Sequence, residues 1–234
     1  MLLLAADTSG KSGSIALAQA GDGQESVDVL EVVPLDGRAF SAQLIPQIAE
    51  LLQKHGKGYS KNDLSAFAVA TGPGSFTGLR VGLAAIKALA ETLKKPIVSI
   101  SILEVIARSS ASRGRIVAVL DAGRNELYVG DYEVGPSPAD VRLHGEFLLS
   151  RKEFLAEFLA SDRLPRSVVT PDAAVAGSVQ VDGRNIELIE YPNAGAIAQF
   201  GWERLQQGRI VLAEDLDANY LRHSTDSKPV AGAK

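Results

Sequence analysis

Cysteine is missing from all 234 residues of this sequence. The chain therefore has no disulfide, no thiolate nucleophile and no cysteine ligand for zinc, which excludes a disulfide-stapled secreted module. No apolar run approaches the ~20 residues that a membrane-spanning helix needs, and the first residues lack the cationic start and cleavage region of a signal peptide. We therefore expect a cytoplasmic protein that does not bind a membrane.

Positive charge and histidine are also scarce. The chain has 24 Lys and Arg against 28 Asp and Glu, a net charge of −4. Because binding to nucleic acid depends mainly on Lys and Arg neutralising phosphates, we expect RNA to be reached only through a basic partner. The histidines are His55, His144 and His223, and none lies at helical spacing from another. The sequence therefore predicts no metal site.

The first half of the chain alternates between strand and helix patterns. Short apolar runs between turn residues predict strands at 2–6, 13–18, 27–33, 66–70 and 97–100, and apolar residues at helical spacing predict helices at 42–54, 78–93 and 102–107. The glycines at 56 and 58 are expected to end the first of these helices. Pro46 is compatible with that helix only near its first turn, because proline has no N–H to donate.

The second half repeats this order loosely. Strands are predicted at 116–120, 126–133, 141–149, 168–169 and 186–189. A capping-box pattern at 150–153 predicts the start of a helix, and Asn193 is expected to cap a last helix that reaches Gln207. The final residues, 223–234, show no apolar periodicity and are expected to be disordered.

Two aspartates mark the duplication. Asp7 and Asp121 each end a strand before a hairpin, 114 positions apart, close to half the chain. We interpret this as an α/β fold built from a duplicated βββαβα unit, the actin-like (ASKHA) arrangement, with an N-terminal lobe at 1–103 and a C-terminal lobe at 104–222. The alternative is an unrelated pair of α+β domains that share an order of elements.

Two groups of residues are candidates for binding a nucleotide or another anion. A glycine-rich loop runs directly into a helix, whose first N–H groups lack partners, and the acidic hairpins would face one another across a cleft. The candidates are Asp7, Thr8, Ser9, Gly72, Gly74 and Ser75. The alternatives are structural: the glycines would allow a tight crossing from strand to helix, and Asp7 and Asp121 would accept hydrogen bonds from their own turns.

The two longest helices of the first half are too apolar for ordinary surface helices. Their candidate interface residues are Leu44, Ile45, Ile48, Leu52, Leu79, Leu83 and Ile86. A helix that is apolar nearly all round is either buried or shared with another chain. We predict a partner interface here; the alternative is burial under the second half of the same chain.

The sequence resembles the TsaB (YeaZ) family over nearly its whole length. The resemblance is carried by Ala6–Ser9, Ser14–Leu17, Ser41–Pro46, Gly72–Gly82, Asp121–Ala122, Glu126–Tyr128 and Tyr220–Arg222. It departs from the family at Phe40, where a histidine is frequent, and at Gly123–Arg124, where the family has an Asp-Ala-Arg turn.

The resemblance implies a non-catalytic scaffold in the synthesis of threonylcarbamoyladenosine in tRNA. It implies binding to the catalytic TsaD subunit, joined by the ATPase TsaE, and a homodimer when the chain is alone. It further implies no cofactor of its own, with ATP or ADP held within the complex and tRNA reached only through it. The alternatives from the residues are an actin-like ATPase or phosphotransferase that uses Asp7 and Asp121, and a plain homodimeric interaction module.

Overall fold

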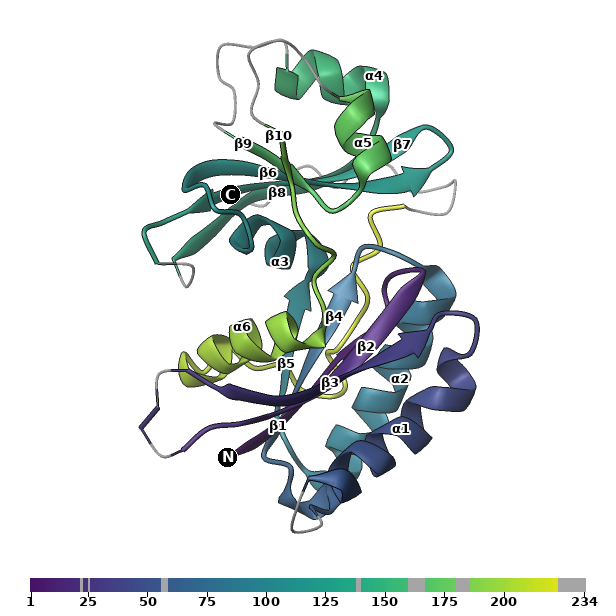
Figure 1. The fold of residues 1–234 in the computed structure, drawn as a ribbon, viewed down its shortest axis with the longest axis vertical. Coiled ribbons are helices and arrows are strands. Elements are labelled where there is room, and N and C mark those ends of the chain that lie inside the picture. The colour runs from purple at the N-terminus through teal and green to yellow at the C-terminus, as the bar shows by residue number, and fades with distance from the viewer. Residues whose placement is uncertain are drawn as a thin grey trace.

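Two five-stranded mixed sheets form the centres of two lobes, one above the other in Figure 1. The computed structural model describes residues 1–21, 23–24, 26–55, 59–137, 140–159, 167–179 and 186–222. The predicted disorder at 223–234 and the predicted helix end at 56–58 lie outside these residues. Among the described residues, no helix combines the length and apolarity needed to cross a bilayer.

The first sheet has the strand order β3-β2-β1-β4-β5. Its strands are β1 (Leu2–Asp7), β2 (Ser12–Gln19), β3 (Asp28–Asp36), β4 (Ala66–Gly72) and β5 (Ile97–Ser101). The helices of this half are α1 (Phe40–Lys54), the short 3-10 helix η1 (Lys61–Asp63), α2 (Phe76–Leu93) and α3 (Ile102–Arg108). The hairpins β1–β2 and β2–β3 are antiparallel, whereas β4 and β5 run parallel to β1 after helical crossovers.

The second sheet repeats this order as β8-β7-β6-β9-β10. Its strands are β6 (Gly114–Gly123), β7 (Glu126–Val134), β8 (Val141–Ser150), β9 (Ser167–Thr170) and β10 (Ile186–Leu188). Its helices are α4 (Arg151–Phe154) with the π-helical turn η2 (Leu155–Leu159), α5 (Ala173–Ser178) and α6 (Ala194–Gln206). The predicted caps are confirmed: Ser150 and Glu153 form a capping box, and Asn193 accepts from Gly195.

The two halves therefore share one topology, and the predicted duplication with its two-lobe actin-like fold is confirmed. Each unit is longer than predicted, because a parallel strand and a further helix follow βββαβα in both halves. The helix α5 was missed by the sequence analysis, although Asp172 caps it by accepting from Ala174 and Val175. The alternative of two unrelated α+β domains is excluded, because strand order and strand direction match throughout.

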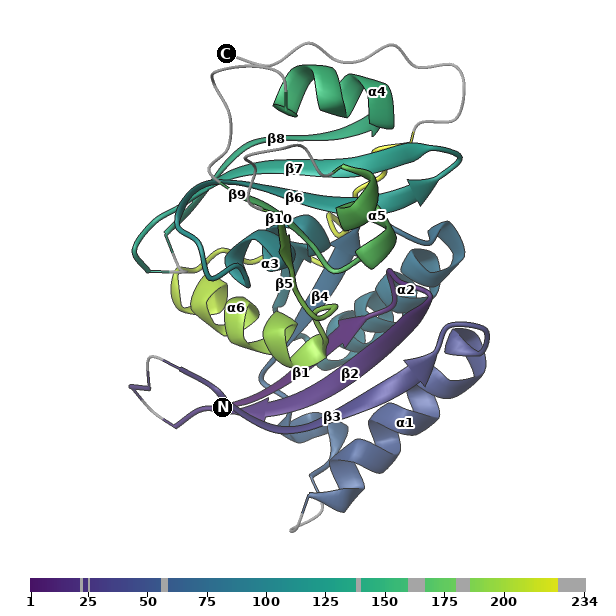
Figure 2. The same cartoon turned by 45° about the horizontal axis from the view of Figure 1, so that its top comes forward.

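The last helix of each half lies between the lobes. Figures 1 and 2 show α3 under the second sheet and α6 over the first. Accordingly α3 contacts β6 and β7, while α6 contacts β1, β2, β4 and β5. The boundary predicted between residues 103 and 104 falls inside α3, and α6 packs on the lobe opposite to its own half.

The candidate interface residues lie mostly inside the chain's own core. Leu44, Ile48, Leu52, Leu79, Leu83 and Ile86 are all buried, whereas Ile45 is 49% exposed. All the buried ones except Leu79 belong to one cluster with residues of β1, β2 and β4. This corrects the expectation that these side chains face solvent. The alternative, burial under the second half of the chain, is also corrected. These side chains are buried mainly by the first sheet and by the facing helix, and Leu216 is the buried residue of the cluster that comes from the second half.

Pro46 lies inside α1, beyond the first turn where it was predicted. The helix begins at Phe40, earlier than the expected start at Ala42, so the missing N–H of Pro46 falls opposite the carbonyl of Ala42. Both residues are exposed. Water can therefore satisfy that carbonyl, and the helix continues to Lys54.

Candidate functional site

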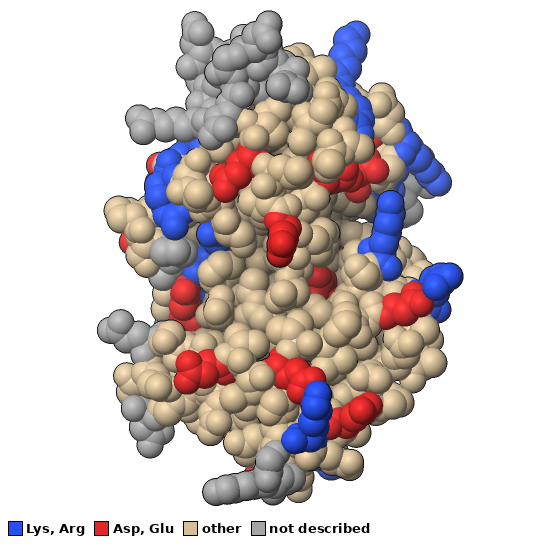
Figure 3. Space-filling model, viewed as in Figure 1, with Lys and Arg blue, Asp and Glu red and all other residues tan. Residues whose placement is uncertain are grey.

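The two hairpins that follow Asp7 and Asp121 face one another across a cleft of about 1080 Å³ between the lobes. The cleft is lined by residues from both halves: Ser9, Gly10, Lys11, Ser12, Asp36, Gly37, Arg38, Pro73, Gly74, Ser75, Leu120, Asp121, Ala122, Gly123, Tyr128, Pro171, Asp172, Ala173 and Tyr191. In Figure 3, Lys and Arg side chains gather along the right-hand edge, from the upper lobe down to the junction of the lobes. The sequence-predicted Ser9, Gly74, Ser75 and Asp121 meet here.

Asp7 is held by its own turn. The carboxylate is 1% exposed and its Oδ1 accepts hydrogen bonds from the Ser9 backbone N–H at 2.8 Å and from the Ser9 hydroxyl at 2.6 Å. Burial raises the pKa of Asp7, and the two bonds from Ser9 oppose that rise. The geometry favours the structural role for Asp7, as the acceptor that shapes the β1–β2 turn.

Asp121 has the corresponding position in the second half but a more open environment. Its side chain is 40% exposed, lies 3.5 Å from Arg151 Nη2 and accepts from the Gly123 N–H at 3.3 Å. This carboxylate therefore also supports its own hairpin, and its ion pair with Arg151 joins the hairpin to α4. Unlike Asp7, it lines the cleft.

The glycine-rich loop packs directly on the β1–β2 turn. A Cβ at Gly74 would lie 2.1 Å from the Ser9 carbonyl oxygen, and one at Gly78 would lie 2.1 Å from that of Thr8. The Ser75 N–H donates to the Ser9 carbonyl at 2.7 Å, and the Ser75 hydroxyl caps α2 by accepting from Gly78 at 3.2 Å. These contacts require glycine, so the tight-crossing interpretation is sufficient to explain the loop.

Two further predicted residues lie beneath this loop. Thr8 is 2% exposed, and its Oγ1 is 2.1 Å from where a Cβ at Gly82 would be. Gly72 is buried and has φ of +101°, a conformation that glycine adopts without strain. Both residues support the loop from below. Anion binding by the loop stays a prediction.

The cleft also contains residues that the sequence analysis did not select. Lys11 and Arg38 bring positive charge to its lower rim, and Arg38 pairs with Asp36 at 3.1 Å. The Tyr191 hydroxyl lies 3.5 Å from Ser9 Oγ, while the residue as a whole is 41% exposed. Tyr191 precedes α6, far from Ser9 in sequence, and no local pattern marks it.

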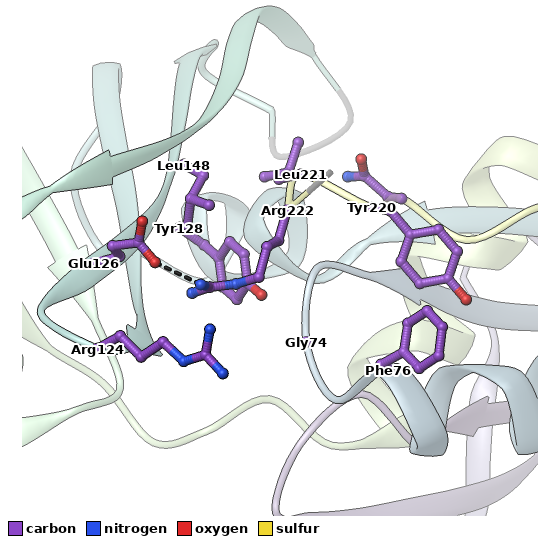
Figure 4. Close-up of a pocket in the computed structure, with 10 residues that line it drawn as sticks. Gly74, Phe76, Arg124, Glu126, Tyr128, Leu148, Tyr220, Leu221 and Arg222 are labelled. Atoms are coloured by element: carbon purple, nitrogen blue, oxygen red, sulfur yellow. Dashed lines mark ion pairs between the residues drawn. The ribbon is translucent and has the colours of Figure 1, made fainter. Parts of the chain in front are cut away.

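A second, smaller pocket of about 550 Å³ opens beside the cleft and shares Gly74 and Tyr128 with it. Figure 4 shows its residues, which come from the β6–β7 hairpin, β8, the glycine-rich loop with the start of α2, and the C-terminal segment. Its lining is Gly74, Phe76, Arg124, Glu126, Tyr128, Leu148, Asn219, Tyr220, Leu221 and Arg222. We call this the hairpin pocket.

The two histidines that the structure describes lie on different lobes. His55 lies 2.8 Å from Glu31, His144 is exposed on β8, and His223 is outside the described residues. Within the part of the chain that the structure describes, no three His, Asp or Glu residues lie close enough to hold a metal ion.

Comparisons with known proteins find similarity to a TsaD family model and to TsaB proteins. Residues 32–155 match the family model described as TsaD, tRNA N6-adenosine threonylcarbamoyltransferase. The chain is 31% identical to the tRNA threonylcarbamoyladenosine biosynthesis protein TsaB of Escherichia coli over 247 residues, covering 99% of each chain. It is 29% identical to the Haemophilus influenzae protein of the same name, covering 99% of this chain and 98% of that protein.

The solved structures show the same fold. A Pseudomonas aeruginosa protein described as similar to the peptidase YeaZ superposes with a TM-score of 0.75 at 24% identity, covering 94% of this chain and 99% of that one. A structure named YeaZ from the same organism gives a TM-score of 0.71 at 22% identity, covering 93% and 100%. With sequence similarity over its full length and the two-lobe fold, the chain belongs to the TsaB (YeaZ) family.

Proposed function

We propose that this chain takes part in making threonylcarbamoyladenosine in tRNA, as a non-catalytic subunit that binds a TsaD-type transferase through α1 and α2. The observation that carries this proposal is the outer face of these two helices. A TsaE-type ATPase, ATP or ADP held within the complex, and tRNA reached through the complex belong to the same proposal.

The outer face of α1 and α2 exposes small and apolar side chains beside the charged Glu50, Lys54, Arg80 and Glu91. The two helices lie side by side on the outside of the first sheet (Figure 1). Their exposed positions include Ala42, Ile45, Pro46 and Ala49 on α1, and Ala84 and Ala88 on α2. Small side chains allow a partner's helices to approach closely, and burying this apolar area would be favourable by about 25 cal/mol per Å².

The match to the TsaD family model supports a partner of related shape. The matched residues, 32–155, include both helices. When two related folds pair through equivalent faces, each helix pair packs on its counterpart, and a second copy of the chain can occupy the same face. The proposal therefore includes a homodimer that competes with the heterodimer.

The rival activity, ATP hydrolysis or phosphoryl transfer with Asp7 and Asp121, has less support from the geometry. Asp7 is buried and accepts two hydrogen bonds from Ser9, while Asp121 is paired with Arg151. The rival predicts ATP turnover by the purified chain that is lost in Asp7→Ala. That result would replace the scaffold proposal.

The test is capture of a purified TsaD-type subunit by variants of the exposed face. Ala84→Glu should weaken capture by about tenfold or more, because a carboxylate desolvated without a partner is costly. The same change should weaken the homodimer in light scattering. The matched control is Ala156→Glu, which adds the same charge at an exposed position in η2 of the other lobe.

The functional readout is formation of modified tRNA in a mixture with the transferase, the ATPase, the adenylate donor and tRNA. Omission of this chain should abolish product, and Ala84→Glu should reduce it in step with lost capture. If Ala84→Glu captures the transferase as well as Ala156→Glu does, the α1–α2 interface is wrong.

A further inference from the structure

The hairpin pocket has a free cation at its mouth. Figure 4 shows Arg124 reaching from the β6–β7 hairpin toward the loop at Gly74, below the Glu126–Arg222 ion pair. In that pair Arg222 Nη1 lies 2.6 Å from Glu126 Oε2, and Arg222 also donates to the Ala122 carbonyl at 2.9 Å. Among the described residues Arg124 has no such partner. The pocket therefore presents about one uncompensated positive charge.

The backbone of the hairpin holds Arg124 at this position. Arg124 and Asn125 form the two-residue loop between β6 and β7, with φ of 55° and 63°. The left-handed conformation is unfavourable for arginine, and such turns favour asparagine or glycine. The turn directs a long cationic side chain across the pocket, where a shorter residue would suffice to close the hairpin.

Apart from Asn219, the remaining walls of the hairpin pocket are aromatic and apolar. Phe76 is 53% exposed, and its ring centroid lies 5.2 Å from that of Tyr220. Arg80 covers Phe76 at 3.7 Å and donates to the Tyr220 hydroxyl at 3.3 Å, which fixes both rings at the mouth. Tyr128 and Leu148 line the pocket as well. Flat rings around a space of this size suit a planar aromatic group.

We propose that the hairpin pocket binds one unstacked nucleotide of a single-stranded RNA segment, with the phosphate on Arg124 and the base against the aromatic walls. Stacking on aromatic side chains together with contacts to the backbone phosphate is the usual way in which proteins hold single-stranded RNA. The inference rests on the proposed function, in which tRNA is reached through the complex, and it adds a direct contact between this chain and one nucleotide.

A free nucleotide has the same base and phosphate groups as a nucleotide within an RNA strand. The charge of the pocket distinguishes between these two ligands. A nucleoside di- or triphosphate carries several negative charges, whereas each RNA nucleotide carries one, which matches the single uncompensated guanidinium. The adjoining cleft, which shares Gly74 and Tyr128 with the pocket, adds Lys11 at its rim, where a neighbouring phosphate of a longer strand would pass. Arg38 at the same rim is already paired with Asp36.

The experiment is saturation-transfer NMR on the full chain with a seven-nucleotide single-stranded RNA, and with ADP in a separate arm. We expect transfer to the RNA base protons in the unmodified chain. Arg124→Gln and Tyr220→Leu should each weaken RNA binding by about fivefold or more. The matched control is Arg142→Gln, which removes one exposed arginine from β8 outside the pocket and should leave binding unchanged.

Three results would overturn the inference. The first is the absence of saturation transfer to the RNA. The second is an equal loss of RNA binding in Arg124→Gln and Arg142→Gln. The third is transfer to ADP that the RNA does not compete away, which would assign the pocket to a free nucleotide. Circular dichroism of each variant separates lost binding from lost folding. The measurement needs no transferase, so failure here leaves the capture test of the proposed function unaffected.

Discussion

Asp7 combines two properties that oppose one another at the residue scale. Its carboxylate organises the β1–β2 turn through Ser9, yet it does so in a buried position where ionisation is unfavourable. The turn needs an acceptor at this position and does not need a charge. An amide could therefore replace the carboxylate, because its oxygen accepts the same bonds.

We predict that Asp7→Asn keeps the fold and gains stability over the unmodified chain as the pH rises. The folded-state pKa of Asp7 is raised above the unfolded value of 3.8, so its ionisation favours the unfolded state above that value. Asparagine does not titrate. The difference in thermal midpoint between variant and parent should therefore be larger at pH 7 than at pH 3.5, measured by calorimetry.

The control for this prediction is Asp7→Ala. It removes the acceptor and leaves the Ser9 donors unpaired in a buried turn, which should cost about 1–3 kcal/mol of unfolding free energy. If the midpoints of Asp7→Asn and its parent shift equally with pH, the titration of Asp7 does not contribute to stability.

At the scale of the elements, the glycine-rich loop and the β1–β2 turn contact one another and together form one wall of the cleft. The backbone of α2 approaches Thr8 so closely at Gly78 that no side chain fits between them. The close approach places Ser75 and Gly74 in the cleft. The glycines are therefore packing residues first, whatever the loop binds.

We predict that Gly78→Ala destabilises the chain by about 1–3 kcal/mol, because the new methyl group would overlap a backbone oxygen that cannot turn away. The matched control is Gly177→Ala in α5, where a Cβ would meet nothing within 4 Å. That change should leave stability unchanged or raise it by up to about 1 kcal/mol. Urea unfolding of both variants measures the difference, and equal effects would refute the packing role.

At the scale of the whole molecule, buried ionic contacts join the helices that lie between the lobes. Glu104 of α3 accepts from Arg204 of α6, and Arg108 of α3 donates to Glu203 of α6. Burial lowers the pKa of Arg204, while the charge of Glu104 opposes that shift. The network therefore couples the packing of one sheet to the packing of the other.

We predict that Glu104→Gln lowers the unfolding free energy by about 3–5 kcal/mol, because it leaves the largely buried Arg204 without its counter-charge, while Arg108 keeps Glu203. The loss should appear as a shift of one calorimetric transition for both lobes. The control is Glu31→Gln, which breaks the surface pairs with Lys54 and His55 and should have little effect, since pairs near the surface are screened by solvent. Two separate transitions in Glu104→Gln would contradict the coupling.

The order of the elements was determined by the sequence itself. Alternating apolar strands, turn glycines and the acidic residues Asp7 and Asp121 are local signals, so the duplication and the facing hairpins could be predicted without tertiary information. The capping box at Ser150 and the cap at Asn193 were predictable for the same reason, because each cap bonds to the backbone within three residues. For the glycine-rich loop, the sequence left anion binding and a tight crossing both open, and it did not predict the close contact with Thr8.

Only the tertiary structure decided which side chains are exposed and can contact a partner. Periodicity identifies an apolar helix but not which neighbour covers it, so Leu83 and Ile86 proved to be core residues while Ala84 is exposed. Likewise, α6 packs on the lobe opposite to its own half, and Tyr191 reaches Ser9 over a separation of 182 residues. Such contacts depend on how distant segments fill space together, and the close packing of the whole chain determines them.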